Sequence, residues 1–391
     1  MKKIIISTFV LIILSGCAYL GNAHYDDLFG PEQAQERIVP HSTLAGADFL
    51  QNVKPVLDTR CVVCHGCYDA PCQLKLSSPE GIDRGLSKEL VYDGTRLLAT
   101  TPSRLLFDAT NTQQWREKNF TPVLNERVQS EEANLAGSVL FNSLVLKQSY
   151  ELPANEVLDD EFDFSLGRSQ TCATMGEFDR LADEQPHGGM PYGLPGVSRE
   201  EFNHLQNWLK SGGNMSHVKP PSEYDQNKIK GWEAFLNQDN LKYQLSARYI
   251  YEHWFLAHIY FTSENPQSFF KLVRSSTPPG ETIKLINTRR PYDDPKVSRV
   301  YYRFMQERTT ILSKTHLPLE LNEAKLLRLY EQFIAPDYTV TQMPSYKAES
   351  ASNPFKTFEV IPIKSKYQFM LDEAELIIMG FIKGPVCRGQ I

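Results

Sequence analysis

The 391-residue sequence lacks an excess of positive charge and, beyond its first residues, any long apolar run. Its formal net charge is -6 and no segment is strongly basic, which argues against a nucleic acid as its partner. The later apolar runs are too short to cross a bilayer as helices. At 41% hydrophobic and 23% charged residues, the composition is that of a globular protein, and the length allows two or three domains.

The first residues resemble a bacterial secretion signal. Lys2 and Lys3 precede an apolar run, Ile4 to Leu14, that has the length of a signal-peptide core and is too short for a membrane span. The run leads into Leu14-Ser15-Gly16-Cys17, which resembles a lipobox, whose cysteine becomes the lipidated first residue of the mature protein. An ordinary cleaved signal is the alternative. Both interpretations predict a periplasmic protein, and the first predicts a lipid anchor to the outer membrane through Cys17.

The strongest motif is Cys61-Val62-Val63-Cys64-His65. Two thiols one helical turn apart can add to the two vinyl groups of one porphyrin, and the histidine that follows can bind its iron. A structural disulfide or half of a zinc site is the alternative. Zinc would require a second ligand pair at matching spacing, which Cys67 and Cys72 do not form. We therefore expect one covalent haem c, attached to Cys61 and Cys64 with His65 on the iron.

The other cysteines leave several pairings open. Cys67 and Cys72 are close enough in the chain for a short-loop disulfide, with a redox dithiol as the functional alternative. Cys172 and Cys387 remain as a long-range pair or as two free thiols. Sequence alone does not determine the connectivity.

Met190 is the expected sixth ligand of the iron. It precedes Pro191 in a glycine-rich loop, and a helix is predicted to follow, with Ser198 as its N-cap and Gly212-Gly213 as its end. Such a loop and helix resemble the last third of a small cytochrome c, in which a Met-Pro supplies the ligand. An open sixth position is one alternative. The other candidate ligands, in decreasing order, are His187 and then Met175, His204, Met215 and His217.

We predict a mainly α fold. A cytochrome c-like helical haem domain with a large insertion is expected, opened by an apolar helix that packs against the far end of the domain. A second, mostly helical domain is expected to follow a polar, proline-containing linker. The predicted divisions are 1–17 for the signal, 18–41 for a tether, 42–215 for the haem domain, 216–230 for the linker and 231–391 for the second domain.

Two segments of the second domain carry weaker indications. The aromatic segment 248–261 places Tyr251, Trp254 and Phe261 on one face at helical spacing, which predicts a buried core helix. Arginines between Thr288 and Arg303 either pair with neighbouring aspartates or clamp a phosphate or carboxylate.

Four segments together resemble the bacterial fatty acid cis/trans isomerases: Cys61 to Leu76, Tyr251 to Phe261, Thr288 to Pro295 and Gly384 to Gln390. The resemblance implies a periplasmic haem protein that converts cis double bonds in the acyl chains of membrane phospholipids, or in free fatty acids, to trans. Such conversion stiffens the membrane under solvent or heat stress. Members of the family run longer than this sequence, so we expect the second domain to be incomplete.

The resemblance also implies a mechanism and a partner. A ferric haem close to the alkene would weaken the double bond long enough for rotation, with the aromatic segment Tyr251 to Phe261 as a wall for the acyl chain. The expected partner is a membrane phospholipid, met through peripheral or lipid-anchored contact, while the oligomeric state stays open. The alternatives are a periplasmic electron-transfer cytochrome and an inactive fragment that binds haem.

Overall fold

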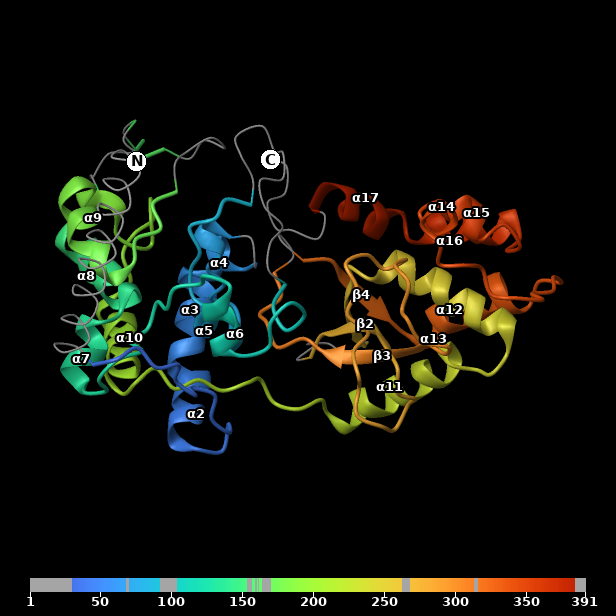
Figure 1. Cartoon of the computed structure of the whole chain (residues 1–391), viewed down its shortest axis with the longest axis horizontal. Coiled ribbons are helices and arrows are strands. Elements are labelled where there is room, and N and C mark those ends of the chain that lie inside the picture. The colour runs from blue at the N-terminus through green and yellow to red at the C-terminus, as the bar shows by residue number, and fades with distance from the viewer. Residues whose placement is uncertain are drawn as a thin grey trace, which may run out of the picture. The chain divides into compact units, whose positions relative to one another are not determined.

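The computed structural model in Figure 1 describes residues 30–67, 70–91, 104–152, 157–158, 160, 162–163, 170–261, 268–312 and 316–383. The predicted secretion signal, Cys17 and Cys387 lie outside these ranges. The chain divides into two compact units, residues 1–217 and residues 218–391. The change from one unit to the next falls within the stretch for which the sequence predicts a linker, and helix α11 begins inside that stretch, at Glu223.

The first unit is built from short helices and loops. Its described helices and helical turns are α2 (Leu44–Asp48), η1 (Phe49–Val53), α3 (Lys54–Arg60), α4 (Val62–His65), η2 (Pro71–Gln73), α5 (Pro79–Arg84), α6 (Thr112–Glu117), α7 (Glu131–Ala136), α8 (Val139–Ser149), η3 (Met175–Glu177), α9 (Phe178–Glu184), η4 (Pro186–Gly188) and α10 (Arg199–Lys210). Helices α2 to α4 follow one another almost without interruption and lead directly into the predicted haem motif.

The opening helical run packs against α10, as the sequence predicts. Phe49 in η1 is 2% exposed, and its ring centre lies 5.9 Å from that of Trp208 in α10. Leu205 and Leu209, on the same face of α10, are also buried in the core of this unit. An aromatic contact between helices so far apart in the chain holds the two ends of the unit together.

The ends of α10 confirm the local sequence prediction. The Ser198 hydroxyl accepts a hydrogen bond from the backbone N–H of Glu201, whose carboxylate in turn accepts one from the N–H of Ser198. This reciprocal pair satisfies backbone groups that a helix start leaves without partners. Gly212 and Gly213 follow the helix with φ angles of 97° and 72°, a region that L side chains rarely adopt, so glycine ends the helix here.

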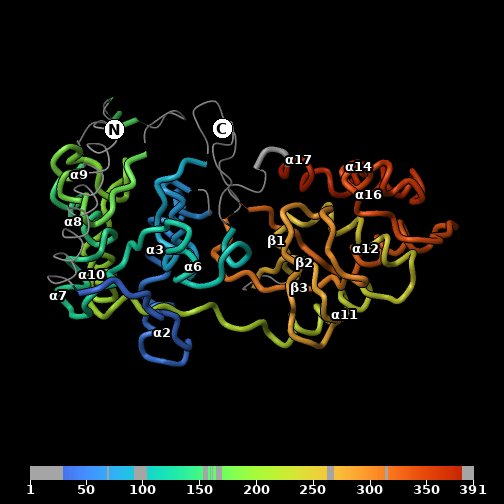
Figure 2. The backbone as a smooth tube through the Cα atoms, in the orientation of Figure 1, coloured from blue at the N-terminus to red at the C-terminus, as the bar shows by residue number. Residues whose placement is uncertain are grey.

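The second unit combines helices with a four-stranded sheet. Its described elements are α11 (Glu223–Leu236), α12 (Leu241–Trp254), β1 (His258–Phe261), β2 (Phe270–Ser275), β3 (Tyr301–Gln306), β4 (Pro318–Leu321), α13 (Glu323–Leu329), η5 (Tyr330–Ile334), α14 (Ala348–Ala351), α15 (Pro354–Thr357), α16 (Ile363–Asp372) and α17 (Ala374–Lys383). The strand order is β3-β2-β1-β4, with β4 parallel to β1 and the other neighbours antiparallel. Figure 2 shows β1, β2 and β3 side by side.

Helix α11 covers the edge of this sheet. It runs beside β3 (Figure 1), and the Asn237 side chain accepts from the N–H of Tyr302 and donates to its carbonyl, both at 2.8 Å. Two residues further along the strand, Glu233 accepts from the N–H of Phe304 at 2.9 Å. These side chains occupy backbone groups that an edge strand would otherwise offer to another chain.

The prediction of a mainly α chain is wrong, because the second unit holds a mixed sheet. The aromatic segment 248–261, predicted as one helix, is divided: α12 ends at Trp254 and β1 begins at His258. A strand of four residues is too short to show its own period, and its aromatic positions happen to match helical spacing. No helix in the described ranges is long and apolar enough to cross a membrane.

Candidate functional site

The predicted haem motif forms a single helical turn. Cys61 precedes α4, and its carbonyl accepts from the N–H groups of Cys64 at 3.2 Å and His65 at 3.0 Å. The two thiols are therefore one turn apart, and neither belongs to a disulfide. Cys64 is exposed, whereas Cys61 is half-buried and packs against the core of the first unit. This spacing suits two thioether bonds to one porphyrin.

His65 is held by the loop that follows it. Its side chain is 9% exposed, and Nδ1 lies 3.0 Å from the carbonyl oxygen of Leu74. A carbonyl can only accept, so Nδ1 carries the proton and Nε2 is the nitrogen with a lone pair. The N–H of Leu76 donates to the carbonyl of His65 at 2.8 Å, which closes the same loop. An iron-binding histidine needs this arrangement, in which one nitrogen is anchored and the other can ligate.

The surroundings of the Cys61 thiol disfavour its charged form. Burial, followed by the neighbouring Cys64, raises the pKa of the Cys61 thiol to about 12. The thiolate is the form that reacts and that binds metals, so burial lowers the reactivity of Cys61 in the unliganded protein. Among the residues that the structure describes, no three or more His, Cys, Asp or Glu side chains form a group that could hold a metal ion.

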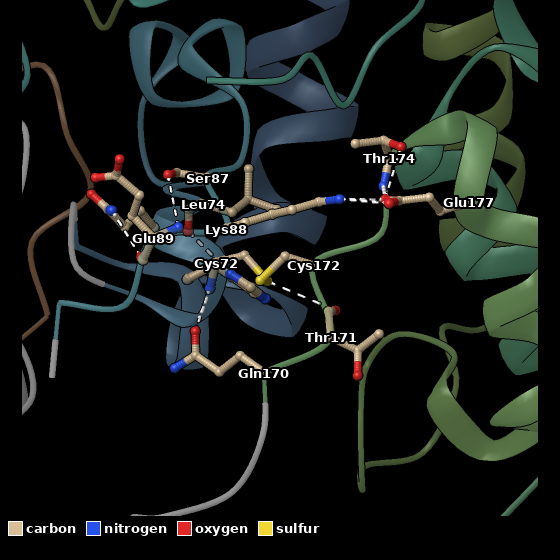
Figure 3. Close-up of a disulfide and its surroundings, with 12 residues drawn as sticks. Cys72, Leu74, Ser87, Lys88, Glu89, Gln170, Thr171, Cys172, Thr174 and Glu177 are labelled. Carbon is tan, nitrogen blue, oxygen red and sulfur yellow. Dashed lines mark hydrogen bonds and ion pairs between the residues drawn. A yellow bond between two sulfur atoms is a disulfide. The ribbon is translucent and has the colours of Figure 1, made fainter. Parts of the chain in front are cut away.

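A disulfide between Cys72 and Cys172 lies close to this loop (Figure 3). The Cα atoms are 5.5 Å apart, although 100 positions separate them in the sequence. The predicted Cys67–Cys72 bridge is therefore wrong, and so is the prediction that leaves Cys172 to Cys387 or as a free thiol. Cys67 is itself disulfide-bonded, but not to Cys72. The sequence favoured the short loop because spacing cannot show which distant segments meet in space.

The disulfide joins the segment that holds His65 to a distant part of the unit. The N–H of Cys72 donates to the Gln170 side chain at 3.0 Å, and Lys88 pairs with Glu177 at 2.6 Å (Figure 3). Leu74, whose carbonyl holds His65, follows Cys72 by two positions. The acceptor of the His65 hydrogen bond is thus fixed by a covalent link and an ion pair.

The loop with Met190 packs closely on α8 and is tied to the helix before the haem motif. The N–H of Met190, a half-buried residue, donates to the carbonyl of Ser143 at 3.0 Å. A Cβ at Gly189 would lie 2.3 Å from the backbone nitrogen of Lys147, so only glycine fits this approach. Arg60, which precedes Cys61, donates to the carbonyl of Gly196 at 2.9 Å. The assignment of Met190 as the sixth ligand stays a prediction.

The competing candidate ligands have other contacts in the structure. Met215 is fully buried in the core, and the Met175 sulfur accepts from Asn142 at 3.7 Å. His217 Nε2 lies 2.7 Å from a Glu80 carboxylate oxygen. His187 lies against aromatic rings, with ring centres 5.9 Å from Phe162 and 6.1 Å from Tyr150, and His204 lies 3.9 Å from Glu200.

Two features of this site were missed at the sequence level. Leu74 acts through its backbone carbonyl, and a backbone acceptor leaves no mark in the sequence. Arg60 also pairs with Glu201 of α10 at 3.3 Å, which connects the motif to the helix after the Met190 loop. The position of Arg60 directly before Cys61 was the one available indication.

The comparison with known protein families gives one match. The model of the family described as "Fatty acid cis/trans isomerase (CTI)" matches residues 100–391, well over half of the chain. The haem motif at 61–65 precedes the matched range. No curated protein and no solved structure matches the chain. The chain belongs to the fatty acid cis/trans isomerase family and is an isomerase.

Proposed function

We propose that this isomerase uses one haem c, bound through Cys61, Cys64 and His65, to convert cis double bonds in the acyl chains of membrane phospholipids to trans. The observation that carries the proposal is the motif itself: two thiols one turn apart, outside any disulfide, followed by a histidine whose Nδ1 is held by Leu74. This arrangement matches the residues and the spacing that haem attachment requires.

Covalent attachment of the haem to the two cysteines requires no oxidant. The S–H of each cysteine adds across one vinyl group, so that sulfur bonds to one carbon and the hydrogen moves to the other. The exposed position of Cys64 leaves it accessible for this addition. His65 then presents Nε2 in an orientation fixed by the Leu74 carbonyl.

Rotation about a full double bond has a prohibitive barrier, so the catalyst must lower the bond order. A ferric haem held there would supply this by withdrawing electron density from the alkene, and substrate and product would keep the same atoms and electrons. The chain's part is to hold the group beside the acyl chain and to control its sixth position, for which Met190 is the candidate. The predicted secretion signal and Cys17 support a periplasmic site of action, with an anchor in the outer membrane. Because trans acyl chains stiffen the membrane, the reaction would serve adaptation to stress.

The test is an assay on vesicles of cis-monounsaturated phospholipid. The haem-loaded chain should produce trans acyl chains, measured by gas chromatography, and replacement of both Cys61 and Cys64 by serine should abolish them. Leu44→Ala, at a residue that is 92% exposed, is the matched control and should retain full activity. Activity in the haem-free protein would overturn the proposal. Reversible iron reduction without any trans product would instead favour an electron-transfer cytochrome.

A further inference from the structure

The second unit buries the side chains of two arginines. Arg248 lies in α12 and Arg274 in β2, and each is 1% exposed. Within the described ranges, the structure gives these two guanidinium groups one carboxylate partner, Glu252, whose side chain is 8% exposed. Burying a charge is costly unless it is paired, so one buried positive charge remains to be compensated.

Arg248 has one nitrogen without a partner. Its Nε pairs with the Glu252 carboxylate at 2.8 Å, and its Nη1 donates to the carbonyl of Pro344 at 2.8 Å. The guanidinium carbon lies 3.7 Å from the centre of the Tyr346 ring, a close cation–π contact. Nη2 is buried and has no hydrogen-bond partner among the described residues. An unsatisfied donor in this position can donate to an oxygen atom of a bound ligand.

Arg274 also has one buried nitrogen without a hydrogen-bond partner among the described residues. Its Nη1 donates to the carbonyl of Asp293 at 2.9 Å, its Nη2 donates to the Thr288 hydroxyl, and its Nε is buried without a partner in the described part of the chain. The partners of Arg274 are thus uncharged: a carbonyl, the Thr288 hydroxyl and the hydroxyls of Tyr251 and Tyr346. Thr288 and Asp293, in the segment for which the sequence left aspartate pairing and an anion clamp as alternatives, thus both support this arginine.

Tyrosine side chains join the two arginines into one cluster. Tyr302 lies opposite Arg274 in the sheet, and its ring centre is 5.3 Å from that of Tyr251 in α12. Burial raises the pKa of both Tyr302 and Tyr346, and both guanidinium charges oppose this rise. The two cations therefore act on the same groups, and the tyrosines remain neutral and cannot supply the missing negative charge.

We propose that Arg248 and Arg274 bind the anionic head group of the acyl substrate, a carboxylate or phosphate oxyanion, between α12 and β2. The inference rests on the proposed function for the identity of the substrate. Guanidinium groups bind carboxylate and phosphate through their N–H donors, and each of the two arginines has one unsatisfied nitrogen that can serve this purpose. Tyr346 is half-buried and covers Arg248, so the entering head group displaces this ring.

Equilibrium binding to the haem-loaded chain tests the site. The probes are cis-9-hexadecenoate, its methyl ester, and a short-chain phosphatidate. On the unmodified protein, the free acid or the phosphatidate should bind at least tenfold more tightly than the uncharged ester. The acid and the phosphatidate distinguish a free fatty acid head group from a phospholipid phosphate.

Variants give the second readout. Arg274→Gln should weaken binding of the anionic probe at least tenfold, whereas Arg299→Gln, a half-buried arginine of the same unit, should leave it unchanged. Glu252→Gln should tighten binding several-fold, because it removes the competing carboxylate. This opposite direction separates the site from a loss of folding, and it decides the question if the arginine variants fold poorly.

Equal binding of acid and ester would overturn the proposal, and so would binding that Glu252→Gln leaves unchanged or weakens. Isomerisation is measured separately on the same preparations. If the unmodified protein shows no preference for the anionic probes but still isomerises by a haem-dependent route, the result would count against this inference alone. Tight anion binding together with isomerisation that persists in haem-free protein would count against the haem proposal alone.

Discussion

His65 Nδ1 and the carbonyl oxygen of Leu74 lie 3.0 Å apart, and this contact fixes which nitrogen of the imidazole can reach a metal. The acceptor belongs to the backbone and follows the disulfide-bonded Cys72 by two positions. The ring is thus oriented before any cofactor binds, which lowers the entropic cost of ligation.

Replacing His65 by glycine should remove the ligand but leave the thiols of Cys61 and Cys64. We expect isomerisation to fall to background, and added imidazole to restore part of it by occupying the space that the ring leaves. The measurement is trans acyl chain production with and without imidazole. His204→Ala, at a partly exposed position, is the control. Full activity of the glycine variant without imidazole would rule out His65 as the ligand.

Met190→Ala tests the sixth ligand. If the Met190 sulfur binds the iron, the oxidised haem-loaded protein should show the long-wavelength absorption of methionine ligation, and the variant should lose it. Met175→Ala is the matched control, because that sulfur accepts a hydrogen bond from Asn142. A band absent from the unmodified protein, or retained in the Met190 variant, would contradict the assignment.

Replacing both Cys72 and Cys172 by serine should destabilise the first unit. The bridge closes a loop with a sequence separation of 100, and loss of such a link costs about 2–4 kcal/mol, chiefly through the larger entropy of the unfolded chain. Urea unfolding of the variant and the parent, both without reductant, measures the difference. An unchanged midpoint would show that the covalent link adds nothing beyond the Lys88–Glu177 pair and the Gln170 contact.

The sequence predicted local features well and distant contacts poorly. Helix α10 was predictable because neighbouring residues in the sequence determine its start and its end, Ser198 at the N-cap and Gly212-Gly213 after the last turn. Strand β1 was not, since its parallel partner β4 lies far along the chain and its four residues fit helical spacing too. The Cys72–Cys172 bridge likewise depends on how the segments around it fold. The haem motif could be recognised in the sequence because its chemistry requires residues that are close together in the chain.

Asp83 gives the first unit a defined pH dependence. It lies in a buried ion network, 3.3 Å from Arg37, which also approaches Glu126, itself paired with Arg116. Burial, opposed by the Arg37 guanidinium, raises the pKa of Asp83 from 3.8 to about 6. Because the pKa of Asp83 is higher in the folded than in the unfolded chain, protonated Asp83 stabilises the fold. This stabilisation is fully present below the pKa of the unfolded chain and is lost as the pH rises through the pKa of the folded chain.

Asp83→Asn, which imitates the protonated form, should remove that dependence. A shift of roughly two pKa units corresponds to about 3 kcal/mol, so the parent should lose up to about that much relative to the variant between about pH 4 and pH 6. Urea unfolding at several pH values measures the difference, with the exposed Asp179→Asn as the control. A difference that stays constant across this window, or that grows in favour of the parent as the pH rises, would show that the network holds Asp83 ionised throughout.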